Sequence, residues 1–150
     1  MAKLIQLKDK LGNLLYPKIK SNSIIKVNKT ANQSIAQSTP TEIIWNIETF
    51  KIGTGLELLN NKIYIRDQNI KAVQVISQIQ YGGNANPIIY ILKNGVQISN
   101  FSMAGGYVFN NSIIDVIKDD YISINTYTTI AAQQLNFNIA WTNLIVSAIY

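Results

Sequence analysis

The chain has no cysteine and no histidine among its 150 residues. It therefore lacks the thiol nucleophile, the most common general base and the soft metal ligands, and no disulfide bond holds its fold. No run approaches the roughly 18 to 20 consecutive apolar residues of a membrane span, and lysines interrupt the first apolar residues too early for a secretory signal. These absences predict a protein that is made in the cytoplasm and is not inserted into a membrane.

One class of enzyme remains open, the glycosidases that work with two carboxylates. The acidic residues, however, fall at expected strand ends or turns, where Asp caps the backbone and Glu stays solvated. They are Glu42, Glu48, Glu57, Asp67, Asp115, Asp119 and Asp120. The adjacent Asp119 and Asp120 offer too few oxygen atoms for calcium, which takes roughly six to eight. We expect no enzyme, and no catalytic, cofactor-binding or metal-binding residues.

Charged residues make up only 14% of the chain, and they are unevenly placed. The first thirty residues hold seven lysines and one aspartate, a net charge of +6, whereas the other 120 hold six basic and seven acidic residues, a net charge of −1. A nucleic-acid-binding protein would carry its basic residues on a folded face with aromatic or arginine stacking partners, and Arg66 is the single arginine here. We expect a solvated basic segment and no nucleic acid as a partner.

The composition is that of an all-β protein. Isoleucine dominates the apolar residues, Asn, Gln, Ser and Thr dominate the polar ones, and 47% of the chain is hydrophobic. This balance suits half-buried strands better than charged helical faces. About ten short apolar runs recur between turns of Asn, Gly and Asp, without a sustained helical period. The pattern predicts one domain, a two-sheet jelly-roll sandwich of about ten strands.

The clearest element is a β-hairpin over residues 88–101, with Asn94 and Gly95 at its turn. A two-residue type I′ turn needs positive φ at both central positions, which Asn and Gly tolerate best. The expected register pairs Lys93 with Val96, Leu92 with Gln97, Ile91 with Ile98 and Tyr90 with Ser99. Both faces of the hairpin then carry apolar residues. We expect one face to cover the core and the other to meet a second subunit.

Other stretches show the same two-residue period. The strand expected over 71–81 points one set of side chains to the same side, namely Val73, Val75, Ile79 and Tyr81. A turn at Asn60 and Asn61 places a second set on one face, namely Leu56, Leu58, Ile63 and Ile65. Near the end of the chain a third set alternates with polar or small residues, namely Leu135, Phe137, Ile139 and Trp141. The polar, lysine-rich stretch 18–32 is interpreted as a linker into the first strand.

Three expected loops have the least apolar side chains and offer both donors and acceptors: Gly82 to Asn86, Ser102 to Gly106 and Thr128 to Gln134. Tyr81 and Tyr107 flank two of them. A tyrosine ring against a sugar with amides on its hydroxyls would make a weak glycan site. The candidate ligand contacts are therefore Tyr81, Asn84, Asn86 and Tyr107, and the alternative is that these loops are merely solvated turns.

The first twenty residues form a small unit of their own, either a hairpin turning at Gly12 or an amphipathic helix. Either is too small to bury its leucines alone, so the segment must dock on another protein. The run Leu7-Lys8-Asp9-Lys10-Leu11-Gly12-Asn13-Leu14-Leu15-Tyr16-Pro17 resembles the opening of many bacteriophage fibre, baseplate and appendage proteins. The resemblance implies an arm that anchors to the virion, and the anchoring residues are Leu4, Leu7, Leu14, Leu15 and Tyr16.

The order of the later pieces resembles a second family, the trimeric jelly roll shared by tumour necrosis factor and the globular heads of complement. The matching segments are Val75 to Tyr81, Lys93 to Gly95, Val116 to Ile124 and Thr142 to Ile149. The resemblance implies a homotrimer whose subunit contacts are lined by aromatic residues.

Together the two resemblances imply a structural protein of a phage particle, a head (capsid) or tail fibre on the virion surface that is made in the host cytoplasm. Residues 1–22 would be the arm that attaches to other virion proteins, and residues 23–150 a trimeric head that projects outward. Binding of a host-surface glycan is a further expectation. The alternative is a bacterial carbohydrate-binding or cell-surface interaction module.

Overall fold

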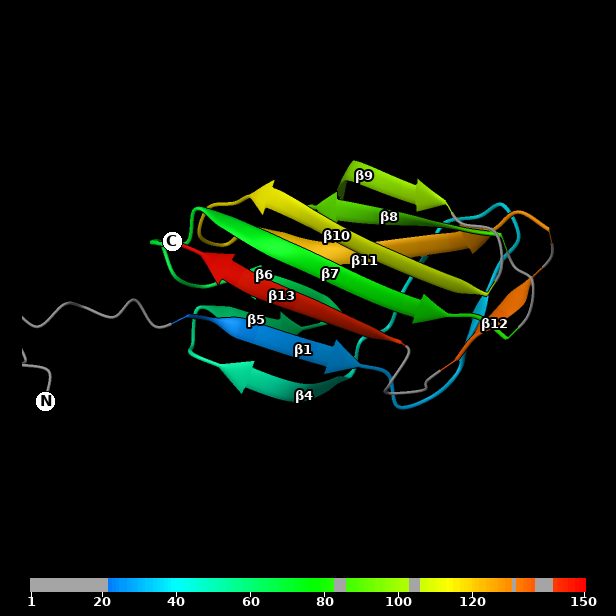
Figure 1. Cartoon of the computed structure of the whole chain (residues 1–150), viewed down its shortest axis with the longest axis horizontal. Helices are drawn as coiled ribbons and strands as arrows, with labels where there is room; N and C mark the ends of the chain where they lie inside the picture. The colour runs from blue at the N-terminus through cyan, green and yellow to red at the C-terminus, as the bar shows by residue number, and fades with distance from the viewer. Residues whose placement is uncertain (1–21, 83–85, 103–105, 131, 137–141) are drawn as a thin grey trace, which may run out of the picture.

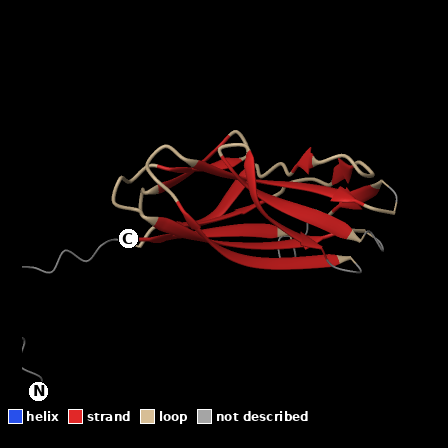
Figure 2. Cartoon of the chain, turned by 90° about the horizontal axis from the view of Figure 1, so that it is seen from above, coloured by secondary structure: helices blue, strands red, loops and turns tan. Residues whose placement is uncertain are grey.

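Two antiparallel sheets pack face to face in the computed structural model, which describes residues 22–82, 86–102, 106–130, 132–136 and 142–150 (Figures 1 and 2). The first sheet has the strand order β10 (Tyr107–Asp115), β7 (Ala72–Gln80), β13 (Asn143–Ile149), β1 (Ile24–Asn28) and β4 (Ile47–Ile52). The second has the order β5 (Leu56–Leu59), β6 (Lys62–Ile65), β11 (Tyr121–Thr128), β8 (Pro87–Lys93) and β9 (Val96–Ser102), with β3 (Thr41–Glu42) paired to β11. A short pair, β2 (Gln33–Ile35) and β12 (Gln133–Leu135), lies at one end. The predicted all-β jelly roll is confirmed.

The core lies between the two sheets and is filled mainly by isoleucine and valine. On β7 the side chains of Val73, Val75, Ile79 and Tyr81 are buried, as the two-residue period predicts. The facing sheet buries β-branched residues from β8 and β11, namely Ile89, Ile91, Ile122 and Ile124. The largest buried side chain among the described residues, Trp45, comes from the segment between β3 and β4. No helix that could span a membrane occurs in the part of the chain described here.

Both predicted two-residue turns are present. Asn94 and Gly95 have φ of 52° and 79°, the positive values that a type I′ turn requires. Asn60 and Asn61, with φ of 49° and 64°, join β5 to β6 in the same way. The partners that follow from the second turn, Leu56 with Ile65 and Leu58 with Ile63, are those expected.

The register of the 88–101 hairpin departs from the prediction after two pairs. Lys93 pairs with Val96 and Leu92 with Gln97, but Ile91 then pairs with Ser99 rather than Ile98, and Tyr90 with Asn100 rather than Ser99. A β-bulge on β9 inserts the extra residue. Because β9 is the edge strand of its sheet, it is the place where bulges are common and where they limit pairing with another chain.

The stretch 18–32, interpreted as a linker, contains a strand of the sheet. β1 spans Ile24–Asn28 and lies between β13 and β4, so its inward residues Ile25 and Val27 are fully buried. The reason is that Ile24 and Ile25 begin a period-2 pattern that the flanking lysines obscure. The alternation predicted beyond Leu135 falls on residues outside those described; Leu135 itself is buried in β12.

Candidate functional site

The outer face of the sheet β10-β7-β13-β1-β4 carries apolar side chains that no other described part of the chain covers. Directly paired residues point to the same face, so the ladders give its rows. One row reads Asn111, Ile76, Ile145, Lys26 and Phe50, and the next reads Ile113, Gln74, Ser147, Ile24 and Ile52. Phe109 and Ile149 belong to the same face. We call these residues the outer sheet face.

The outer sheet face is exposed in the single chain. Ile113, Phe109 and Phe50 are 69%, 59% and 50% exposed, and Ile52 is also exposed. Soluble monomers seldom leave large apolar patches in water, and such patches mark protein contacts. The 88–101 hairpin, where the sequence predicts a second subunit, also leaves Val96 and Ile98 exposed, at 67% and 42%, so that expectation stays a prediction. On the outer side of that hairpin Tyr90 is half-buried and packs on Tyr127, with ring centroids 5.8 Å apart.

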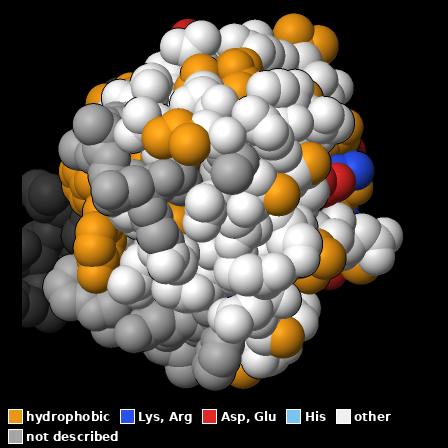
Figure 3. Space-filling model, turned by 90° about the vertical axis from the view of Figure 1, so that its right-hand side faces the viewer, with side chains coloured by type: hydrophobic (Ala, Val, Ile, Leu, Met, Phe, Trp, Pro, Cys, Tyr) orange, Lys and Arg blue, Asp and Glu red, His pale blue; other side chains and the backbone are white. Residues whose placement is uncertain are grey.

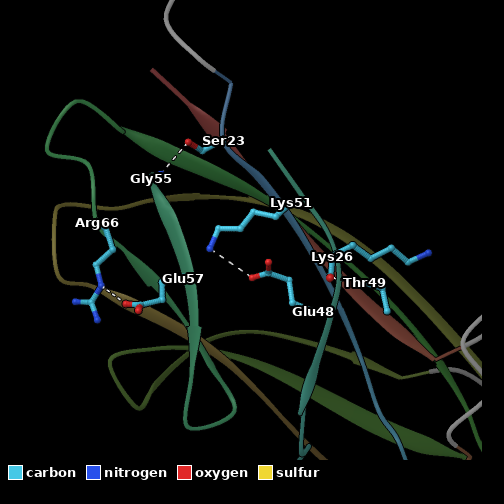
Figure 4. A network of polar contacts seen from close by, with 8 residues as sticks. All are labelled: Ser23, Lys26, Glu48, Thr49, Lys51, Gly55, Glu57 and Arg66. Carbon is cyan, nitrogen blue, oxygen red and sulfur yellow. Dashed lines mark hydrogen bonds and ion pairs between the residues drawn. The ribbon is translucent and has the colours of Figure 1, made fainter. Parts of the chain in front are cut away.

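The open edge of the sandwich next to β4 is charged instead of apolar. Glu48 and Lys51 stand opposite the inward residues of β1 and form an ion pair of 3.4 Å. The guanidinium of Arg66, which follows β6, donates to Glu57 of β5 at 2.6 Å (Figure 4). Inward-pointing charges of this kind keep an edge strand from pairing with another sheet. Among the described residues of this sheet, the apolar surface is therefore the outer sheet face and not the β4 edge.

The described residues hold no group of three or more His, Cys, Asp or Glu side chains placed to bind a metal ion. The hollows on the described surface are open, and their linings mix polar with apolar side chains. One of them, of about 320 Å³ and mainly polar, lies among Thr54, Arg66, Asp67, Gln68, Asn69 and Lys118. None of these hollows brings a nucleophile to a base.

The described strand ends that flank the three loops expected to contact a ligand lie at one end of the molecule. The end of β7 pairs with the start of β10, and the start of β8 pairs with the ends of β9 and β11. This end lies opposite the one where the described chain begins and where β13 ends (Figure 1). We call it the loop tip. Seen end-on in Figure 3, its described surface is largely uncharged, with charged side chains only at the margin.

Tyr81 is not available to a ligand, which corrects one of the candidate contacts. Its side chain is 3% exposed, and its hydroxyl forms a hydrogen bond with the Thr126 hydroxyl inside the core. Burial raises the pKa of this phenol. The two-residue period that the sequence predicts over 71–81 continues to position 81, so Tyr81 points inward with Val75 and Ile79 and not toward the loop that follows.

The other candidates are placed differently. Tyr107 is 48% exposed at the start of β10, where its hydroxyl accepts a hydrogen bond of 2.9 Å from Gln80. Asn86 is half-buried with a φ of 39°, and its carbonyl accepts from the Thr129 hydroxyl at 3.1 Å. Asn84 and the anchoring residues Leu4, Leu7, Leu14, Leu15 and Tyr16 lie outside the described residues.

Lys29, assigned to the solvated basic segment, is buried. It is 3% exposed, and its ammonium donates to the Gln33 side-chain oxygen at 2.7 Å and the Ile44 carbonyl at 3.1 Å. Gln33 also bonds the backbone of Glu42 and Ile44, and so holds the segment that carries Trp45. Without a carboxylate partner in hydrogen-bond contact, desolvation lowers the pKa of Lys29 to about 8.

We expect the free energy of unfolding to rise as the pH is raised from about 8 toward 10.5, the ordinary lysine value. In that window the unfolded chain binds a proton at Lys29 that the folded chain has lost, so folding is favoured by higher pH. Urea unfolding at about pH 7.5 and about pH 9.5 measures the change. Lys29→Met lacks the titrating group and should show a smaller rise. An equal rise in both proteins would contradict this origin.

No family model matches the chain, and a search of curated protein sequences gave no match. Solved structures do match, over most of the chain. Murine APRIL, in its crystal structure at pH 8.0, has a TM-score of 0.70 at 15% identity, covering 85% of this chain and 99% of that one. Eiger TNF from S. frugiperda has 0.59 at 8% identity, covering 86% and 92%. PRD1 vertex protein P5 has 0.58 at 15% identity, covering 89% and 100%. At these identities the likeness establishes the fold alone, a jelly roll of the tumour necrosis factor type.

Proposed function

We propose that this protein is a structural protein of a phage particle whose jelly-roll head assembles as a homotrimer. The outer sheet face carries the proposal, because Phe50, Phe109 and Ile113 are exposed on it in the single chain. A second and third copy would remove these side chains from water, at roughly 25 cal/mol for each Å² of apolar surface buried. The resemblance to trimeric jelly rolls and the structural likeness to APRIL and Eiger support three copies.

The proposed trimer is a closed ring in which each copy uses two different patches. In such an assembly one patch of the first copy meets another patch of the next, and the rotation closes after three. The outer sheet face spans five strands, with β4 at one edge and β10 at the other. The part near β4 can contact one neighbouring copy, and the part near β10 can contact the other. The charged residues beside β4 disfavour edge-to-edge pairing with a strand of another copy. In the proposed trimer the outer sheet faces of the three copies therefore point toward the three-fold axis.

The ends of the head suit a role on a particle surface. The described chain enters the head at the end opposite the loop tip (Figure 1), so an arm that attaches to the virion would leave the tip facing outward. The likeness to a protein described as a vertex protein of PRD1 supports a place on a virion. We propose that the tip, with Tyr107 and Asn86 near it, meets the host surface and that a glycan is the ligand class.

The mass of the isolated protein tests the trimer. We expect light scattering at micromolar concentration to give three times the chain mass of 16.8 kDa, and a stable monomer would refute the proposal. Electron microscopy of labelled particles then tests the place on the virion. A trimer that is absent from particles but binds glycans would favour the carbohydrate-binding module instead.

A further inference from the structure

The outer sheet face carries two charged side chains among its described strand positions. β7 contributes Ala72, Gln74, Ile76, Gln78 and Gln80, and β13 contributes Asn143, Ile145, Ser147 and Ile149, none of them charged. The single cation is Lys26 on β1, and the single anion is Asp115 on β10. An interface built from this face would have to accommodate one positive and one negative charge from each copy.

Lys26 stands in an apolar setting. It lies between Ile145 and Phe50 in its row and is half-buried in the single chain. Figure 4 shows its side chain pointing away from the Glu48–Lys51 pair, on the other side of the sheet. Its ammonium has no hydrogen bond or ion pair among the residues that the structure describes. Covering this position with another copy would bury a charge that needs a partner.

Asp115 is the last residue of β10 and is exposed. The ammonium of Lys93 donates to the Asp115 backbone carbonyl at 3.1 Å, but its ion pair is with the Asp120 carboxylate at 3.9 Å. Within the described ranges the Asp115 carboxylate itself has no hydrogen bond or ion pair. It is thus free to accept a cation from outside the chain.

The two charges lie on the same face of the sheet but near its opposite edges. Lys26 is on β1, next to the edge strand β4, whereas Asp115 is on β10, the other edge strand. The strands are tilted, so that β10 ends over the same part of the long axis as β1 (Figure 1). In a closed ring, one side of each copy meets the opposite side of the next. A ring around the long axis would bring a cation of one copy and an anion of its neighbour to the same level.

We propose that Lys26 of each copy forms an ion pair with Asp115 of the next copy in the ring, an inference that rests on the proposed homotrimer. The three pairs would fix which sides of the copies meet and at what height, because any other register would bury both charges without partners. The occupant of the outer sheet face is therefore a second copy of this chain. A different protein would need its own acidic and basic residues at matching places.

Charge-exchange variants test the pair in a protein whose wild type has first been shown to be a trimer. Lys26→Glu and Asp115→Lys should each raise the concentration at which the trimer half-dissociates by roughly 30-fold or more, since each places like charges together. The double variant keeps the net charge of the wild type and should recover most of the affinity. Lys118→Glu, in the exposed turn after β10, is the matched control and should leave assembly unchanged.

A second measurement guards against variants that misfold. The chain has no cysteine, so Lys26→Cys with Asp115→Cys introduces the only two thiols. A short bismaleimide should join neighbouring copies of this double variant into a ladder that ends at a covalent trimer, while either single variant should not form trimers. If the wild type is a trimer, but the charge variants assemble normally and the double-cysteine variant is not cross-linked, the ion pair alone is overturned. A monomeric wild type would overturn the proposed trimer as well.

Discussion

Ile113→Glu is expected to convert the trimer into folded monomers. Ile113 is 69% exposed on β10 in the single chain, so a carboxylate there stays in water and should change the stability of the monomer by only about 0.5 kcal/mol. In the trimer the same carboxylate would lie against apolar side chains of the next copy. An uncompensated buried charge costs several kcal/mol, about 3 to 5 where it has been measured for broken ion pairs. Sedimentation equilibrium measures the loss of assembly.

Ile117→Glu is the matched control for this prediction. Ile117 is 72% exposed, almost as Ile113 is, but it follows β10 in the turn toward β11 and is not on the outer sheet face. The same substitution at equal exposure should leave the trimer intact. If both variants stay trimeric, the copies meet through another surface. Circular dichroism of both should match the wild type, because neither side chain contributes to the core.

The sequence predicts the fold well where local chemistry is unambiguous. Asn94-Gly95 and Asn60-Asn61 adopt positive φ, as a two-residue hairpin turn requires. The geometry of such a turn determines which residues of the two strands pair next to it. The prediction fails one step further from the turn, at the β-bulge beside Ile98, because no local signal marks where an edge strand takes an extra residue. Short-range turn chemistry fixes two residue pairs, and tertiary context decides the rest.

The candidate interface could be predicted only in part. Two-faced apolarity indicates that a surface besides the core is buried, but it does not identify the sheet. The 88–101 hairpin has its outer Tyr90 packed on Tyr127 and leaves Val96 and Ile98 exposed, whereas the sheet with β4 and β10 leaves a larger apolar set in water, including Phe50 and Ile113. That difference depends on which strands become neighbours, and strand order is a property of the whole chain. The sequence signal for this interface is the alternation along β10, where Phe109 and Ile113 are apolar although they fall between residues that point into the core.

The burial of Lys29 and Tyr81 also depends on residues that are distant in the sequence or on the facing of a whole strand. Lys29 is an ordinary solvated residue by composition, and its burial depends on Gln33 and the Ile44 carbonyl, which lie farther along the chain. Tyr81 continues the inward alternation of β7 although glycines follow it immediately. The last residue of a strand still follows the alternation of side chains along that strand, so it can point into the core even where a loop begins directly after it.

Removal of residues 1–22 is expected to leave the head folded while abolishing its incorporation into particles. The head closes at Ser23, which is 1% exposed: its hydroxyl bonds the Tyr150 hydroxyl at 2.9 Å and accepts from the Gly55 amide at 3.1 Å. The contacts described for the sandwich thus begin where the deletion ends. The melting temperature of the truncated protein should therefore stay within a few degrees of the wild type.

Two further proteins make this deletion informative. Removing residues 1–28 also takes β1 from between β13 and β4 and exposes two strand edges, so this longer truncation should fail to fold. In the full-length chain, Leu14→Asp with Leu15→Asp keeps every residue of the head but places charge where the arm would bury its leucines, and should abolish incorporation just as the deletion does. About twenty residues span up to roughly 70 Å when extended, enough to reach several neighbouring coat subunits.

Two outcomes of the 1–22 deletion would contradict the prediction. Incorporation of the truncated protein at the wild-type level would show that the head itself binds the particle. Unfolding of the truncated protein would show that the leucines of residues 1–22 belong to the core of the head.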